Sequence, residues 1–184
     1  MRVARAVAIG AAATMGTSLL IPAAVAFGAS APAGGKVNVF VTQSPNSSKG
    51  TIVVAGAIGD YGKTVNVDKS GKPNANGSYV KISLQQGSFL VNATQLNAKL
   101  NHLKPTINRA TCSVEASETG PVSLSNGAGL YTGISGNLQI TVTFAFIGPR
   151  FASGPHKGQC NFNNNAPSLA QYQSITGSGK VSFS

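Results

Sequence analysis

The regular alternation of apolar and polar residues is the feature that most constrains the fold of this chain. A period of two is typical of a strand with one face buried and the other face in water. In the clearest run, every second residue is apolar: Leu138, Ile140, Val142, Phe144 and Phe146. Shorter runs of the same kind continue from Val37 to the C-terminus, separated by turn-forming stretches. The expected strands are 37–42, 51–56, 64–68, 79–84, 88–92, 110–117, 120–127, 136–148 and 171–184.

One segment departs from this period and predicts a helix. Three leucines are spaced so that they lie on one helical face: Leu96, Leu100 and Leu103. Asn92 or Thr94 is placed to cap the first turn, and we expect the helix to end before Pro105. The helix would have two or three turns and cover one opening or edge of the sheet. About eight strands, one short helix and 22 glycines predict an all-β domain, either an antiparallel eight-stranded barrel or an open β-sandwich.

The N-terminal residues have the organisation of a secretory signal peptide. Arg2 and Arg5 form a basic start, and an apolar run over 6–20 follows. Pro22 interrupts this run, which is short for a helix that crosses a bilayer. The small residues at 24–26 provide a cleavage site. We therefore expect the chain to be exported and cleaved.

Cleavage divides the chain into three predicted parts. We expect 1–26 to be the signal peptide, 27–36 a flexible lead and 37–184 a single β-barrel domain, with 29–31 as a second cleavage site. Removal of the signal peptide leaves 158 of the 184 residues, enough for one domain with a substantial core. No later stretch is long and apolar enough to form a transmembrane helix, so the predicted localisation is secreted or extracellular.

The mature chain is strongly basic because it has few acidic residues. Loss of Arg2 and Arg5 leaves 12 basic residues against four acidic ones, a net charge of +8. No two of the basic residues are adjacent, and they are not interleaved with aromatic residues as in a nucleic-acid footprint. We expect weak attraction to anionic surfaces and no specific binding of nucleic acid.

Two cysteines, Cys112 and Cys160, remain in the mature chain. An even pair in an exported protein is most simply explained as a disulfide. A reactive thiol would need a base such as His102 or His156, and neither cysteine lies in a recognisable nucleophile motif. We therefore predict a structural disulfide between the two.

The segment Ala57–Thr64 (AIGDYGKT) matches a loosened phosphate-binding loop. Such a loop requires a helix directly after it, because phosphate binds to the N–H groups at the start of that helix. The residues after Thr64 have strand alternation followed by turn residues, so we interpret the match as a glycine-rich hairpin loop.

No other catalytic arrangement is evident in the sequence. A carboxylate pair would have to come from Asp60, Asp68, Glu115 and Glu118. Two histidines and a disulfide do not readily supply a metal site, and there is no nucleophile-elbow sequence. The sequence therefore predicts no metal, cofactor or catalytic residue.

A glycine-rich phrase precedes the clearest strand. Its pattern is Gly127-x-Gly129-x-Tyr131-x-Gly133-x-x-Gly136. The phrase resembles the turn and following strand of allene oxide cyclase and dirigent-type barrels. Most of the predicted domain also resembles small exported bacterial proteins of unknown activity that keep two cysteines and end in a strand like SITGSGKVSF. The resemblance implies an eight-stranded antiparallel barrel with an apolar interior, and no catalytic residue is carried over from it.

Three classes of function are consistent with these observations. The first is a secreted, non-catalytic binding or surface-associated barrel that holds a small apolar ligand. The others are a cyclase- or isomerase-like barrel enzyme for a small apolar substrate, and a structural or interaction protein with a filled core. A barrel of eight strands is either filled by side chains or holds one small ligand, and the absence of Trp favours incomplete filling. The predicted ligand-lining residues are Leu138, Ile140, Val142, Phe144, Phe146, Phe89 and Val91.

Overall fold

The computed structural model of the protein describes residues 33–43, 47–163 and 165–184. The predicted signal peptide lies outside the described residues. The described chain forms β1 (Gly35–Gln43), β2 (Lys49–Gly56), β3 (Asp60–Val67), β4 (Tyr79–Leu84), β5 (Gly87–Asn92), α1 (Thr94–Leu100), β6 (Thr106–Asn108), β7 (Ser113–Gly129), β8 (Ile134–Ile147) and β9 (Ala170–Phe183). Strand β1 begins at Gly35, two residues before the predicted domain boundary.

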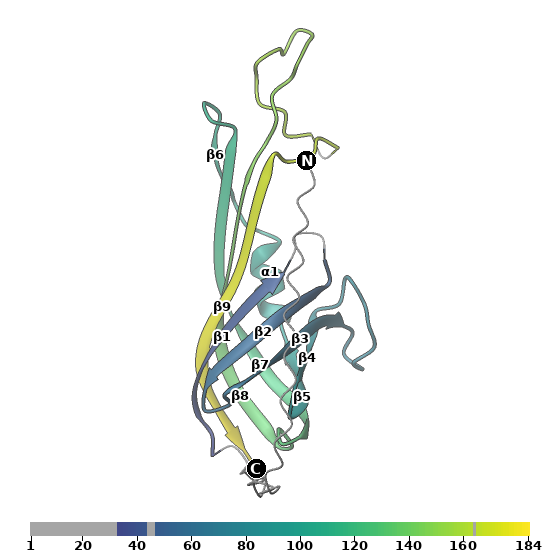
Figure 1. Ribbon diagram of the computed structural model, residues 1–184, viewed down its shortest axis with the longest axis vertical. Coiled ribbons are helices and arrows are strands. Elements are labelled where there is room, and N and C mark those ends of the chain that lie inside the picture. The colour runs from purple at the N-terminus through teal and green to yellow at the C-terminus, as the bar shows by residue number, and fades with distance from the viewer. Residues whose placement is uncertain (1–32, 44–46, 164) are drawn as a thin grey trace, which may run out of the picture. The chain divides into compact units, whose positions relative to one another are not determined.

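Eight of these strands form a closed antiparallel barrel (Figure 1). Neighbouring strands follow the order β1, β2, β3, β4, β5, β7, β8 and β9, and β9 pairs with β1. The pairing of β5 with β7 closes the ring, from Gly87 opposite Gly129 to Asn92 opposite Ser123. Closure leaves no continuous open sheet edge around the ring. The predicted barrel is confirmed, and the alternative of an open sandwich is wrong.

The alternation in the sequence separates the inner face of the barrel wall from the outer face. Val39 of β1 lies opposite Val54 of β2, and both are buried. The next pair, Phe40 opposite Val53, points outward, with exposed fractions of 52% and 49%. The apolar inner residues of seven of the eight strands, all except β3, form one core cluster, which stabilises the barrel by removing apolar surface from water.

Strand β7 is longer than the sequence predicts. We expected a break between 110–117 and 120–127, but a single strand runs from Ser113 to Gly129 and includes Gly120 and Pro121. The ladder with β5 begins only at Ser123. At Pro121, β7 is therefore paired with β8 on one side and has no paired strand on its other side. A proline is tolerated at such an edge because its missing N–H breaks no central ladder.

Strands β7, β8 and β9 continue past the end of β1, as Figure 1 shows. The pairing of β1 with β9 ends at Val41 opposite Ile175. The pairing of β7 with β8 continues to Ser113 opposite Ile147, and β6 adds a short strand along β7. Within the described residues, the inner face of the barrel therefore extends into a sheet with no barrel wall opposite it.

A disulfide links this extension to the loop between β8 and β9. Cys112 precedes β7 and is bonded to Cys160, as predicted. The Arg150 guanidinium adds hydrogen bonds to the carbonyl oxygens of Ala110 at 2.5 Å and Gly158 at 2.6 Å. Covalent and polar contacts thus hold the loop to the start of β7.

Helix α1 begins two residues after β5 and packs against β7. Leu96 is 5% exposed and belongs to the core, and Leu100 packs against that core. The N-cap residue is Ala93 and has no side-chain cap hydrogen bond, so the predicted cap by Asn92 or Thr94 is wrong; Asn92 accepts a hydrogen bond from the backbone N–H of Thr94 at 3.0 Å. Leu103 lies beyond the end of the helix, which has two turns. Strands β1, β3 and β5 run in one direction, so all three end on the side of the barrel where α1 lies.

Candidate functional site

A cavity of about 250 Å³ occupies the interior of the barrel beneath α1. All eight strands of the ring and α1 contribute side chains to it. The apolar lining residues are Val37, Val39, Val41, Ile52, Val54, Ile58, Val80, Ile82, Phe89, Val91, Ala93, Leu96, Leu100, Val122, Leu124, Leu138, Ile140, Val142 and Ile175. Most of them are Val, Ile and Leu, and most belong to the core cluster of the barrel.

Five of the seven residues predicted to face a ligand line this cavity. They are Leu138, Ile140 and Val142 of β8 and Phe89 and Val91 of β5. Alternation groups these residues on one face of each strand, and the structure shows that this face is the inner one.

Phe144 and Phe146 have the same alternation but lie outside the cavity lining. Val142 is level with Ile175, where the ladder between β1 and β9 ends, so residues further along β8 face no opposite wall. The Phe144 and Phe146 rings stack with their centroids 6.4 Å apart. Phe162 of the β8–β9 loop meets Phe146 edge-on at 6.3 Å, and both line a second, more polar pocket beside that loop.

Five polar side chains also line the cavity, and the sequence analysis missed them. They are Gln43, Thr64, Asn66, Asn97 and Gln173. Continuing the inward period of β1 past Val41 reaches Gln43, and continuing that of β9 back from Ile175 reaches Gln173. The period of two could therefore have identified both glutamines as lining residues, but the predicted lining residues are all apolar.

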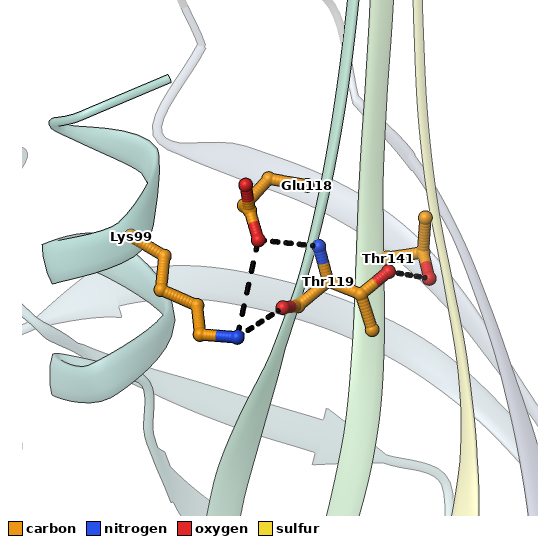
Figure 2. A network of polar contacts seen from close by, with 4 residues as sticks. All are labelled: Lys99, Glu118, Thr119 and Thr141. Atoms are coloured by element: carbon orange, nitrogen blue, oxygen red, sulfur yellow. Dashed lines mark hydrogen bonds and ion pairs between the residues drawn. The ribbon is translucent and has the colours of Figure 1, made fainter. Parts of the chain in front are cut away.

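A small polar network holds α1 to β7 beside the cavity (Figure 2). The Lys99 ammonium donates to the backbone carbonyl of Thr119 at 2.9 Å and lies 3.9 Å from a Glu118 carboxylate oxygen. The same carboxylate oxygen accepts from the backbone N–H of Thr119 at 3.2 Å. On the outer face, the Thr119 and Thr141 hydroxyls are 2.8 Å apart. Since Glu118 lies opposite the lining residue Val142, this ion pair marks the rim of the cavity.

The other end of the barrel is closed by the glycine-rich turn between β7 and β8. Tyr131 is 1% exposed, and its ring meets Phe89 edge-on at 5.7 Å. Its hydroxyl donates to the buried Asp60 carboxylate at 2.5 Å. Gly127 passes so close to the Tyr131 carbonyl oxygen that a Cβ there would collide with it, and Gly133 has a φ of +76°. The glycines singled out in the sequence therefore shape the turn that carries Tyr131.

Asp60 accepts four hydrogen bonds, which decide its protonation state. Besides Tyr131, its donors are the backbone N–H groups of Tyr61 at 2.7 Å, Gln86 at 3.1 Å and Gln85 at 3.4 Å. Burial raises the pKa of Asp60, but these donors together lower it below its ordinary value of 3.8. Burial, followed by the contact with Asp60, raises the pKa of Tyr131 well above its usual range. Asp60 is therefore ionised and Tyr131 neutral near pH 7.

The four carboxylates considered from the sequence are spread over the fold. Asp60 is at the closed end, and Glu118 is at the rim of the cavity. Asp68 lies in the turn after β3, where it accepts hydrogen bonds from Ser70, and Glu115 is exposed on β7. None of the four is a lining residue of the cavity.

Comparison of the chain with protein-family models, with curated proteins and with solved structures returns no match. Within the described residues, no group of three or more His, Cys, Asp and Glu side chains is placed to hold a metal ion. None of the helical structure in that part of the chain is long and apolar enough to cross a membrane. The cavity is therefore the feature from which a function can be argued.

Proposed function

We propose that the protein is a non-catalytic binding protein that holds one small, largely apolar molecule in the barrel. The observation that carries this proposal is the cavity of about 250 Å³ lined by the barrel core. An apolar cavity of about 150 Å³ is sufficient to bind benzene. By simple proportion, this cavity suits a ligand of roughly ten non-hydrogen atoms.

The polar lining favours binding over catalysis. The five polar side chains are four amides and one hydroxyl, and none of them changes protonation state near neutral pH. General acid–base catalysis depends on a group that exchanges a proton in that range. These side chains are better suited to orient a ligand than to transfer a proton to it.

The expected affinity is modest. We take a binding free energy of about −0.6 kcal/mol per non-hydrogen atom, which lies between the values for very small and for drug-sized ligands. Ten atoms then give a binding free energy of roughly −6 kcal/mol. This corresponds to a Kd of about 40 µM. A free ligand concentration of about 200 µM would then stabilise the folded protein by about 1 kcal/mol, which raises Tm by roughly 2–4 °C.

Naphthalene, which has ten carbon atoms, is a suitable apolar probe. We expect saturable 1:1 binding by fluorescence, and a matching rise in Tm by differential scanning calorimetry. Val142→Phe adds bulk at a half-buried lining position and should weaken binding at least tenfold. Val53→Phe is the matched control because Val53 faces solvent. Absence of saturable binding to the native protein, or equal binding by both variants, would contradict the proposal.

We also propose that the protein acts outside the cytoplasm and is weakly attracted to anionic surfaces. The N-terminal signal pattern and the disulfide support export. The outer faces of β1–β4 and β9 support the attraction, because they carry none of the four acidic residues and five exposed lysines. These are Lys36, Lys49, Lys63, Lys81 and Lys180. Retention on anionic vesicles, but not on zwitterionic ones, should fall steeply as salt rises. Equal retention on both would refute the attraction.

A further inference from the structure

The polar lining residues gather at the α1 end of the cavity. Gln43 is the last residue of β1, and Asn66 is the penultimate residue of β3, whose end lies on the same side. Gln173 is the next inward position on β9 beyond the final β1–β9 pair. Asn97 lies on α1 itself. We call these four residues the mouth amides.

The mouth amides have unused hydrogen-bonding capacity. Gln43 donates its amide nitrogen to the Ser47 carbonyl, and Asn66 donates to the Ala75 carbonyl at 3.3 Å, so the side-chain oxygens of both remain as acceptors. Asn97 and Gln173 make no side-chain hydrogen bond to any residue in the described part of the chain. All four side chains are half-buried. A ligand that covers these side chains without forming hydrogen bonds would leave their polar groups buried and unsatisfied. Each such group would cost about 1–3 kcal/mol of binding free energy.

The cavity offers no charge to a ligand. None of its lining residues is charged. The nearby Lys99 and Glu118 lie within ion-pair distance of each other, and Lys99 also donates to the backbone. A carboxylate or an ammonium group placed at the mouth would lose hydration without gaining an opposite charge. A neutral group that both donates and accepts would match the amides without that loss.

From these observations we propose that the ligand is a small neutral amphiphile, with its hydrocarbon part in the barrel and an uncharged polar head, such as an amide or a hydroxyl, at the mouth amides. This inference rests on the proposed binding function and specifies the chemical class of the ligand. The cavity volume limits the whole molecule to roughly ten non-hydrogen atoms, which is the size of an eight-carbon chain with one head group.

The inference is tested by competition against naphthalene with three ligands that each contain eight carbon atoms: octanamide, octanoate and octylammonium at pH 7. We expect octanamide to bind about tenfold more tightly than either charged ligand. Gln173→Leu and Asn97→Leu should each weaken octanamide binding about five- to tenfold relative to naphthalene binding by the same variant. Gln139→Leu is the matched control, because Gln139 is exposed on the outer face of β8. A native circular dichroism spectrum and a cooperative thermal transition show that each variant is folded.

The outcomes separate this inference from the proposed function. If naphthalene binds but octanamide has no advantage over octanoate and octylammonium, the neutral head is wrong and the binding function stands. The same conclusion follows if both leucine variants bind octanamide like the native protein. If neither naphthalene nor octanamide binds, the proposed function fails, and the inference fails with it.

Discussion

The hydrogen bond from Tyr131 to Asp60 provides the sharpest test of how the closed end of the barrel is stabilised. It joins residues 71 positions apart at a distance of 2.5 Å, and Tyr131 is 1% exposed. Tyr131→Phe removes the hydroxyl and keeps the ring against Phe89. A hydrogen bond to a charged group contributes about 1.5–3 kcal/mol, and Asp60 retains its three backbone donors. We expect a loss of about 1.5–3 kcal/mol in the free energy of unfolding, or roughly 4–10 °C in Tm.

The assay is urea unfolding of the native protein and the variant, monitored by circular dichroism. We expect the urea midpoint to shift while the m-value stays constant. Tyr61→Phe is the control because Tyr61 is 60% exposed, and its change should stay within about 0.5 kcal/mol. Asp60→Asn and the double variant complete a cycle that isolates the coupling between the two side chains. A Tyr131→Phe effect no larger than that of Tyr61→Phe would refute the reasoning.

The difference in unfolding free energy between the native protein and Tyr131→Phe should also depend on pH, which provides a second measurement. The pKa of Asp60 in the folded protein lies below 3.8, so its ionised form stabilises the fold above that pH. This stability is lost as the pH falls through the lowered pKa, because a protonated carboxyl accepts a weaker hydrogen bond. The difference in unfolding free energy between the native protein and Tyr131→Phe should therefore be largest near neutral pH and shrink as the pH falls below 3.8.

Three further predictions concern other parts of the fold. Replacing both Cys112 and Cys160 with Ala should lower the free energy of unfolding by about 2–4 kcal/mol and speed proteolysis of the β8–β9 loop, and unchanged unfolding would contradict this role. Gly127→Ala should lower Tm far more than Gly154→Ala. A Cβ at Gly127 would collide with the Tyr131 carbonyl oxygen, whereas a Cβ at Gly154 would meet no atom and would add only the backbone strain of a φ of +80°. Lys180 lies directly opposite Lys36, so Lys180→Glu should stabilise the protein by about 0.2–1 kcal/mol at low salt. That gain should shrink in 1 M salt, and a gain independent of salt would exclude the electrostatic explanation.

The wall of the barrel could be predicted because its signal is local. Alternation along a strand assigns residues to two faces and groups Leu138, Ile140 and Val142 on one of them, but the closed barrel is needed to show that this face is the inner one. Alternation does not show where the opposite wall ends. Phe144 and Phe146 continue the pattern of β8, and only the register with β9 and β1 shows that they lie beyond the barrel cavity.

The two ends of the barrel could not be predicted because they depend on contacts between distant segments. The glycine-rich phrase was evident, but no local pattern connects Tyr131 to Asp60. The position of α1 depends on Gly120, where a Cβ would lie 3.1 Å from the Leu96 Cα. The sequence predicts that Gly120 begins a separate strand, 120–127. In the fold, this glycine lies within β7 and allows the helix to approach.

The closed end and the mouth are stabilised by different interactions, and their variants should therefore separate stability from binding. At the closed end, a buried carboxylate is held by four hydrogen bonds within a turn shaped by close backbone contacts. At the mouth, a two-turn helix is held by Leu96 packing and by a solvent-exposed ion pair, and such a pair contributes at most about 1 kcal/mol. Neither Asp60 nor Tyr131 lines the cavity, whereas Asn97 and Gln173 do. Tyr131→Phe should thus lower stability with little change in naphthalene affinity, and Gln173→Leu should change octanamide affinity with little loss of stability. Ligand exchange is accordingly expected at the α1 end, because local opening occurs where the fewest buried contacts must be broken.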